Sequence, residues 1–76
     1  MSPKLPRITA RELLRALHRD GWEDVRQRGS HLQLAHPSKG GLVTVPVHTG
    51  KTIPPKILTL ILEQAEISPE DLAGLL

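Results

Sequence analysis

A chain of 76 residues has room for one domain with a small core, and without cysteine it has neither disulfides nor thiolate metal ligands to support that core. It has no Phe or Tyr and a single Trp, which argues against an aromatic platform for stacking bases. No apolar run approaches the roughly 20 residues of a membrane span, and residues 1–7 lack the apolar core of a signal peptide, so we expect a cytoplasmic protein.

The formal net charge of +2 conceals an asymmetry along the chain. All ten Lys and Arg residues lie within residues 1–56, together with only four acids, whereas residues 57–76 hold four acids and no base. A basic body with an acidic tail suggests a polyanion as the partner of the body. An equally good interpretation of the charge pattern is that the scattered Lys and Arg residues only keep a small domain soluble.

The first predicted element is a helix over residues 10–20. Residues 1–7 carry two prolines and no periodicity, which predicts a loose arm. Thr9-Ala10-Arg11-Glu12 has the sequence of a capping box, in which Thr and Glu each bond to the other's backbone N–H. Gly21 fits the left-handed position that ends a helix.

Three short alternating segments follow the helix and predict strands over 22–28, 30–35 and 42–47. They are separated by a turn at Gly29 and a loop over 36–41, and such short connections indicate an antiparallel meander. The third segment contains Pro46, which cannot donate to a ladder. We therefore expect it to be an edge strand.

Two further helices complete the predicted fold. Pro54 and Pro55 fit the first turn of a helix, and the wide apolar arc over 57–62 would cover a small sheet. Ser68 is a typical N-cap for a short third helix that ends at about residue 75. The predicted class is α+β in the order α-β-β-β-α, a three-stranded antiparallel sheet with helices on one face and a short extra C-terminal helix. Residues 1–76 form a single domain.

Several short motifs stand at a characteristic spacing along this chain. They are Gly21-Trp22, Arg26, Arg28-Gly29-Ser30-His31, Val45-Pro46-Val47-His48 and a Pro- and Lys-containing start to an apolar helix. In them the chain resembles the HicA-type mRNA interferase toxins, also described as YcfA-like proteins, over about residues 8–72. The resemblance implies a double-stranded-RNA-binding-domain-like fold, ribosome-independent cleavage of mRNA, and a type II toxin–antitoxin system with a cognate HicB-type antitoxin. The family's catalytic histidine falls on His31.

The residues themselves allow His31 such a role. RNA can be cleaved without a metal if a base removes the 2′-OH proton and an acid protonates the departing 5′-oxygen, and histidine suits both tasks. Gly29 lets the backbone approach a phosphate, and Arg26 and Arg28 can contact phosphate oxygens. The strand pattern places His31 on the outward face with Gln33. A surface histidine that only forms hydrogen bonds is the alternative.

Other candidate site residues carry weaker signals. His48 matches the family pattern and is either a second proton carrier or a structural residue at a strand end. Ser30 is expected to orient a partner rather than attack, because no Ser-His-Asp set is evident. The remaining expected RNA contacts are cations, namely Lys39, Lys51 and Lys56 and, on one face of the first helix, Arg11 and Arg15. The alternative for each lysine is a solvated charge, and an ordinary solvated helix face is slightly favoured for the stripe that Arg11 and Arg15 form with Arg19.

No cofactor is expected, and the histidines lack any recognised metal-ligand spacing. His18 and His36 are expected to be solvent-exposed, and Trp22 is expected to anchor the core. The expected partners are mRNA and a HicB-type antitoxin, with the protein a monomer alone or part of a toxin–antitoxin hetero-oligomer. Two other functions stay open: a non-catalytic RNA-binding module, and an adaptor that binds a protein through the apolar, acidic C-terminal segment.

Overall fold

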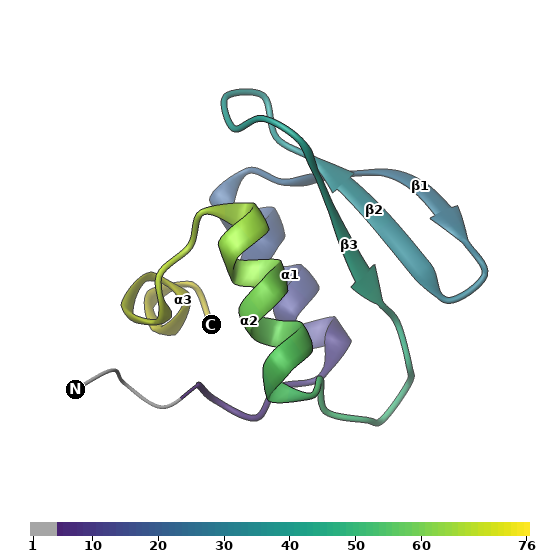
Figure 1. Cartoon of the computed structure of the whole chain (residues 1–76), viewed down its shortest axis with the longest axis vertical. Coiled ribbons are helices and arrows are strands. Elements are labelled where there is room, and N and C mark those ends of the chain that lie inside the picture. Colours follow the sequence, from purple (N-terminus) through teal and green to yellow (C-terminus); the bar gives the residue numbers. More distant parts are fainter. Residues whose placement is uncertain (1–4) are drawn as a thin grey trace.

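A computed structural model describes residues 5–76 and shows a three-stranded antiparallel sheet with three helices. The elements follow one another as α1 (Ala10–Asp20), β1 (Glu23–Arg28), β2 (His31–Ala35), β3 (Leu42–Pro46), α2 (Pro55–Ala65) and α3 (Pro69–Leu75) (Figure 1). Both longer helices lie on the same side of the sheet, and no helix among residues 5–76 covers its other side (Figure 1). The predicted α+β class and element order are confirmed.

Helix α1 begins and ends as its sequence predicts. The Thr9 hydroxyl accepts the Glu12 N–H at 3.2 Å, and the Glu12 carboxylate accepts the Thr9 N–H at 2.9 Å. Both bonds of the capping box are therefore present. Gly21 ends the helix with a φ of 106°, in the left-handed region where a side chain is strained. The cap fixes the direction in which the chain leaves α1 for the sheet.

Trp22 anchors the core, as expected, with only 1% of its surface exposed. Its indole packs edge-on against the ring of His36, with the ring centroids 5.3 Å apart. The expectation that His36 would be solvent-exposed is wrong: it is half-buried, and its Nε2 lies 2.7 Å from the Asp20 carbonyl oxygen. His36 therefore closes the end of the molecule where α1 enters β1.

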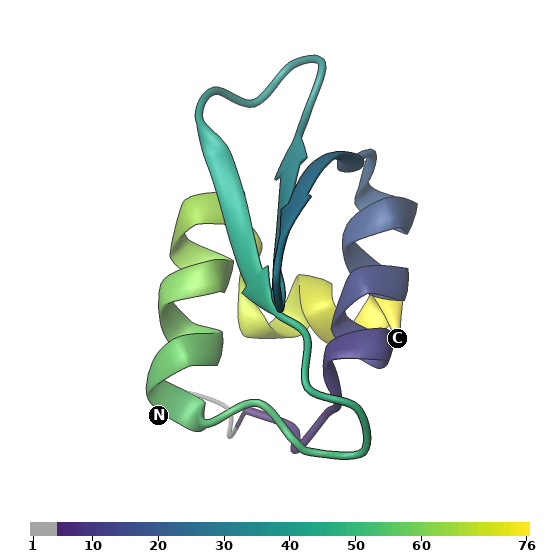
Figure 2. The ribbon, with the colours of Figure 1, turned by 90° about the vertical axis from the view of Figure 1, so that its right-hand side faces the viewer.

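The sheet is amphipathic in two of its three strands. On β2 and β3 the buried positions alternate with more exposed ones, and the side chains that face the helices are Leu32, Leu34, Val43 and Val45. All six residues of β1 are exposed, and the register shifts between Asp24 and Arg26. In the view of Figure 2, α2 is seen next to β3 and α1 next to β1. Strand β1 therefore contributes little to the core and leaves its side chains available to solvent.

Pro46 lies on an edge strand, as predicted, because in the described part of the chain β3 pairs with β2 alone. The Val47 N–H donates to the Ser30 carbonyl at 2.6 Å, so the preceding position in β3 points its backbone nitrogen away from β2. The missing N–H of Pro46 therefore faces the open edge and costs the ladder no hydrogen bond.

The segments before α1 and before α2 are joined at the base of the molecule. The Ile53 N–H donates to the Ile8 carbonyl at 2.8 Å, and Thr9 and Thr52 form an isolated antiparallel bridge. Of the expected loose arm, residues 1–4 lie outside the described part, and Leu5 packs against the core. This junction holds the chain after β3 beside the start of α1.

Helices α2 and α3 are positioned by their N-terminal prolines and caps. Pro55 is the first residue of α2, as predicted. Pro54 was also expected in the first turn, but it is the N-cap, the residue before the helix begins. Ser68 caps α3 by accepting the Asp71 N–H at 3.1 Å, as predicted.

Among residues 5–76, no helix combines the length and the apolar character needed to cross a bilayer.

Candidate functional site

His31 is the first residue of β2 and is exposed. Its ladder partners are Arg28 on β1 and Pro46 on β3. Residues directly opposite one another in an antiparallel pair share a face, so His31 and Arg28 lie side by side on the uncovered face of the sheet. Arg26 lies opposite Gln33 on the same face. The structure thus brings together His31 and both arginines of β1.

The turn before His31 is held from both sides. Gly29 adopts a φ of 55°, and a Cβ at this position would meet no atom within 4 Å. Its carbonyl accepts the side-chain amide of Gln27 at 3.1 Å, while the Ser30 carbonyl accepts the Val47 N–H. Ser30 is half-buried, in keeping with its expected position on the helix side of the sheet. The backbone of this turn, which lies directly beside His31, is therefore not covered by a side chain at Gly29.

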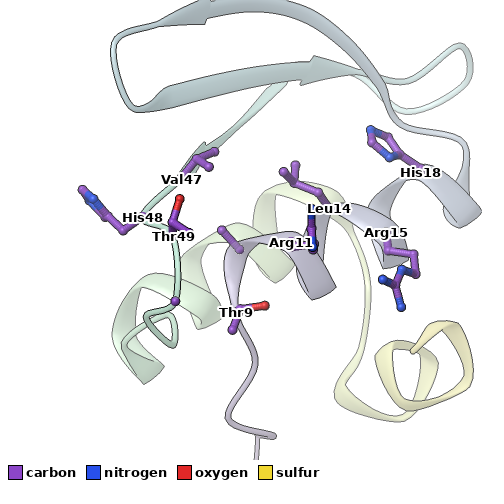
Figure 3. A pocket seen from close by; sticks show the side chains of 10 residues that line it. Thr9, Arg11, Leu14, Arg15, His18, Val47, His48 and Thr49 are labelled. Atoms are coloured by element: carbon purple, nitrogen blue, oxygen red, sulfur yellow. The ribbon is translucent and has the colours of Figure 1, made fainter.

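His48 follows the end of β3 by two residues and is exposed. It borders a small hollow of about 140 Å³ that Lys51 also lines. Its ring points away from α1 (Figure 3). Among residues 5–76, no hydrogen bond joins the rings of His48 and His31, so the two histidines are separate groups in this conformation.

A larger groove of about 760 Å³ lies between α1 and the chain that follows β3 (Figure 3). Arg11 and Arg15 of α1 line it, as does His18 one turn further along. The complete lining is Thr9, Ala10, Arg11, Leu14, Arg15, His18, Val47, His48, Thr49 and Gly50. The four-residue repeat of Arg11 and Arg15 was visible in the sequence, but the facing wall was not, because it depends on the junction of Thr9 with Thr52.

Lys39 lies beyond the opposite end of β2 from His31, and its ammonium group is engaged within the protein. Its Nζ is 2.7 Å from the Asp20 carboxylate, and it also donates to the carbonyls of Ala65 at 2.9 Å and Glu66 at 3.3 Å. This cluster lies beyond Ala35, at the opposite end of β2 from His31. Lys39 therefore joins α1 to the C-terminal end of α2, and we leave it out of the candidate RNA surface.

The remaining cations divide between free and engaged groups. Arg19 donates to the Leu75 carbonyl at 2.7 Å and so supports α3. Lys51 and Lys56 are exposed near the start of α2. His18 is within 2.7 Å of the Asp24 carboxylate, an exposed pair that connects α1 to β1. Across the described residues, no three His, Asp or Glu side chains converge as metal ligands would.

One carboxylate next to the groove has a perturbed pKa. Hydrogen bonds from the Thr9 backbone N–H and then the Thr9 hydroxyl lower the pKa of Glu12, and the nearby charge of Arg15 lowers it further. Glu12 is thereby held ionised in the helix cap. Arg11 and Arg15 form no ion pair within 4 Å among residues 5–76.

The sequence match to known families agrees with this geometry. The family described as the HicA toxin of bacterial toxin–antitoxin systems matches residues 10–67, which run from the start of α1 to just beyond α2. A comparison with curated proteins finds no match for the chain. Because the family match spans most of the chain and includes both the β1–β2 hairpin and β3, the protein belongs to the HicA family of toxins of bacterial toxin–antitoxin systems.

Proposed function

We propose that this toxin acts by cleaving mRNA without a metal ion and that His31 is its general acid–base group. The observation that carries the proposal is the position of His31, which is exposed at the start of β2, opposite Arg28, on the face of the sheet that no helix covers. An extended RNA strand can approach this face directly. The adjoining Gly29 turn leaves space for a phosphate beside the ring.

The chemistry follows from these groups. The 2′-oxygen of a nucleotide attacks the adjacent phosphorus, the bond to the 5′-oxygen breaks, and a 2′,3′-cyclic phosphate and a free 5′-hydroxyl result. His31 takes the proton of the 2′-OH or delivers one to the 5′-oxygen, and water or His48 serves the other step. Acid–base help of this kind contributes roughly 10²–10⁴ in rate. Arg28 and Arg26 stabilise the charge on the phosphate oxygens.

The proposed partners follow from the same face. The substrate is mRNA, and the inhibitor is a HicB-type antitoxin protein. An antitoxin that covers the outer face at Arg28 and His31 would block access to the phosphate. Acidic side chains on its contact surface would match Arg26 and Arg28.

The test is cleavage of end-labelled RNA in the presence of EDTA. We expect the wild-type protein to generate new ends and His31→Ala to lower the rate at least a hundredfold, in line with the ~10²–10⁴ supplied by one acid–base group. The variant should keep its circular dichroism spectrum and its affinity for 2′-O-methyl RNA, which cannot be cleaved by this route. Unchanged cleavage by His31→Ala, or cleavage of the 2′-O-methyl RNA, would refute the mechanism.

A second candidate is a non-catalytic RNA-binding module. It is favoured by one observation, that His31 has no hydrogen-bonded second proton carrier among residues 5–76. This function predicts RNA binding that weakens steeply with salt and produces no new RNA ends. The assay above separates the two functions directly.

A further inference from the structure

The groove between α1 and the chain after β3 differs in composition from the face that carries His31. Its floor is apolar, and Leu14 and Val47 face one another across it (Figure 3). Its rim is cationic, with Arg11 and Arg15 on successive turns of α1. A volume of about 760 Å³ lies within the roughly 300–1,000 Å³ of small-ligand sites. Apolar side chains beside two arginines match a ligand that combines a ring with a phosphate.

The charge of this rim is available to a ligand. The nearby carboxylates form hydrogen bonds to other groups: Asp24 is paired with His18, and the Glu12 carboxylate accepts the N–H and the hydroxyl of Thr9. Within residues 5–76 neither Arg11 nor Arg15 takes part in an ion pair. The groove also begins at the first turn of α1, where the helix dipole adds partial positive charge.

A backbone hydrogen bond joins a residue of the groove to the residue that precedes His31. The Val47 N–H donates to the Ser30 carbonyl at 2.6 Å, and Ser30 precedes His31. Val47 is therefore the neighbour of the residue that precedes His31. A strand of RNA that passes from the outer face at His31 around the end of the sheet would next meet Val47. The two sites lie on opposite faces of the sheet and meet at its end.

We propose that this groove is a nucleotide subsite, which holds one residue of single-stranded RNA adjacent to the phosphate at His31. Arg11 and Arg15 bind its phosphate, and Leu14 and Val47 contact its base or ribose. The inference rests on the proposed RNA substrate but not on cleavage. A single strand is required, because a nucleotide within a duplex cannot enter a groove beside the sheet. The subsite would fix the position of the RNA strand relative to His31.

The first experiment measures binding alone. A 2′-O-methyl RNA hexamer is titrated into the full-length protein, and its affinity is followed as a function of salt. Arg11→Ala with Arg15→Ala should weaken binding roughly a hundredfold and lower the slope of log K against log salt by about 1.4, since each phosphate contact on a single strand contributes about 0.7. Arg15→Ala alone should lower the slope by about 0.7. Arg19→Ala is its matched control, because it removes one charge from the same helix outside the groove, and its slope should be unchanged.

A second variant separates a seated nucleotide from general attraction to a basic surface. Thr49 is exposed on the wall of the groove, and Thr49→Phe would fill the space without changing the charge. We expect this variant to bind the hexamer at least tenfold more weakly and to leave the melting temperature within a few degrees. Backbone amide signals of Ala10, Arg11 and Gly50 should shift on titration of the wild type.

The outcomes distinguish this inference from the proposed activity. If the hexamer leaves those amide signals unmoved, or if Arg15→Ala and Arg19→Ala behave alike, the groove is not a nucleotide subsite, whether or not the protein cleaves RNA. Binding in the groove by a protein that shows no cleavage would support the subsite and refute the nuclease. A groove that binds a protein partner instead would give the first of these results.

Discussion

Arg28 lies directly opposite His31 across the β1–β2 ladder, and the turn that joins them consists of two residues, Gly29 and Ser30. The proposed proton-transfer group and the nearest proposed phosphate ligand therefore belong to one hairpin. Their relative position depends on the ladder and the turn rather than on packing with distant elements.

The first prediction concerns the role of Arg28 in cleavage. Arg28→Ala should lower the rate of RNA cleavage about 10- to 100-fold, because the charge that develops on the phosphate oxygens loses a donor. Arg28→Lys should recover part of the rate, since it keeps the charge but not the paired N–H groups. The measurement is the single-turnover rate on end-labelled RNA. Glu23→Gln, at the other end of β1, is the control, and equal rates for Arg28→Ala and this control would contradict the assignment.

The second prediction concerns the end of α1. An added Cβ at Gly21 would lie 2.7 Å from His36 Nε2, in a backbone conformation with φ of 106°. Gly21→Ala should therefore reduce the free energy of unfolding by about 2 kcal/mol or more, through left-handed strain and the contact with His36. Urea denaturation measures this loss. If the close contact contributes, the double variant with His36→Ala will be more stable than the sum of the two single changes predicts.

The third prediction concerns the α1 cap and its dependence on pH. Thr9→Ala should cost about 1 kcal/mol of stability, the usual effect of losing an N-cap hydroxyl. The pKa of Glu12 is lower in the folded protein than its ordinary value, so the ionised carboxylate favours folding above that value, and this benefit disappears as the pH falls through the lowered pKa.

Urea titrations of the wild type and Glu12→Gln at several pH values test the second part. The difference in unfolding free energy should be constant near neutral pH and should shrink as the pH falls from about 5 to 3. A difference that grows toward acidic pH would reverse the sign and exclude the carboxylate as the source.

The fourth prediction concerns Lys39, whose ammonium group contacts three separate oxygen atoms. Lys39→Met should lower the free energy of unfolding by about 1–3 kcal/mol, because it leaves the partly buried Asp20 carboxylate and two carbonyls without their donor. RNA affinity should change less than twofold at a temperature where the variant is folded. Lys51→Met is the comparison, and a larger loss of RNA affinity for Lys39→Met than for Lys51→Met would return Lys39 to the RNA surface.

Much of the fold was accessible from the sequence because its signals are local. The capping box at Thr9 and the left-handed Gly21 set the limits of α1, and alternation along 30–35 placed His31 and Gln33 on the outward face. Pro46 indicated an edge strand because a missing N–H can be tolerated only where no neighbour needs it. These features depend on residues at most a few positions apart.

The sequence did not reveal contacts between residues that lie far apart in the chain. His36 and Lys39 occupy a loop of polar, flexible composition, and their sequence neighbours give no sign of Trp22, Asp20 or the end of α2. The groove beside Leu14 was equally hidden, since its second wall comes from residues more than 30 positions away.

The sequence by itself determined the elements, their order, the family and the outward position of His31. The reason is that helix and strand periodicity depends on residues close together in the chain. Tertiary structure alone decided which cations are free and which are engaged, and it formed the groove. The physical reason is that a lysine or arginine carries the same charge anywhere in the chain. Whether that charge meets solvent, a carboxylate or a ligand depends on how the helices pack against the sheet.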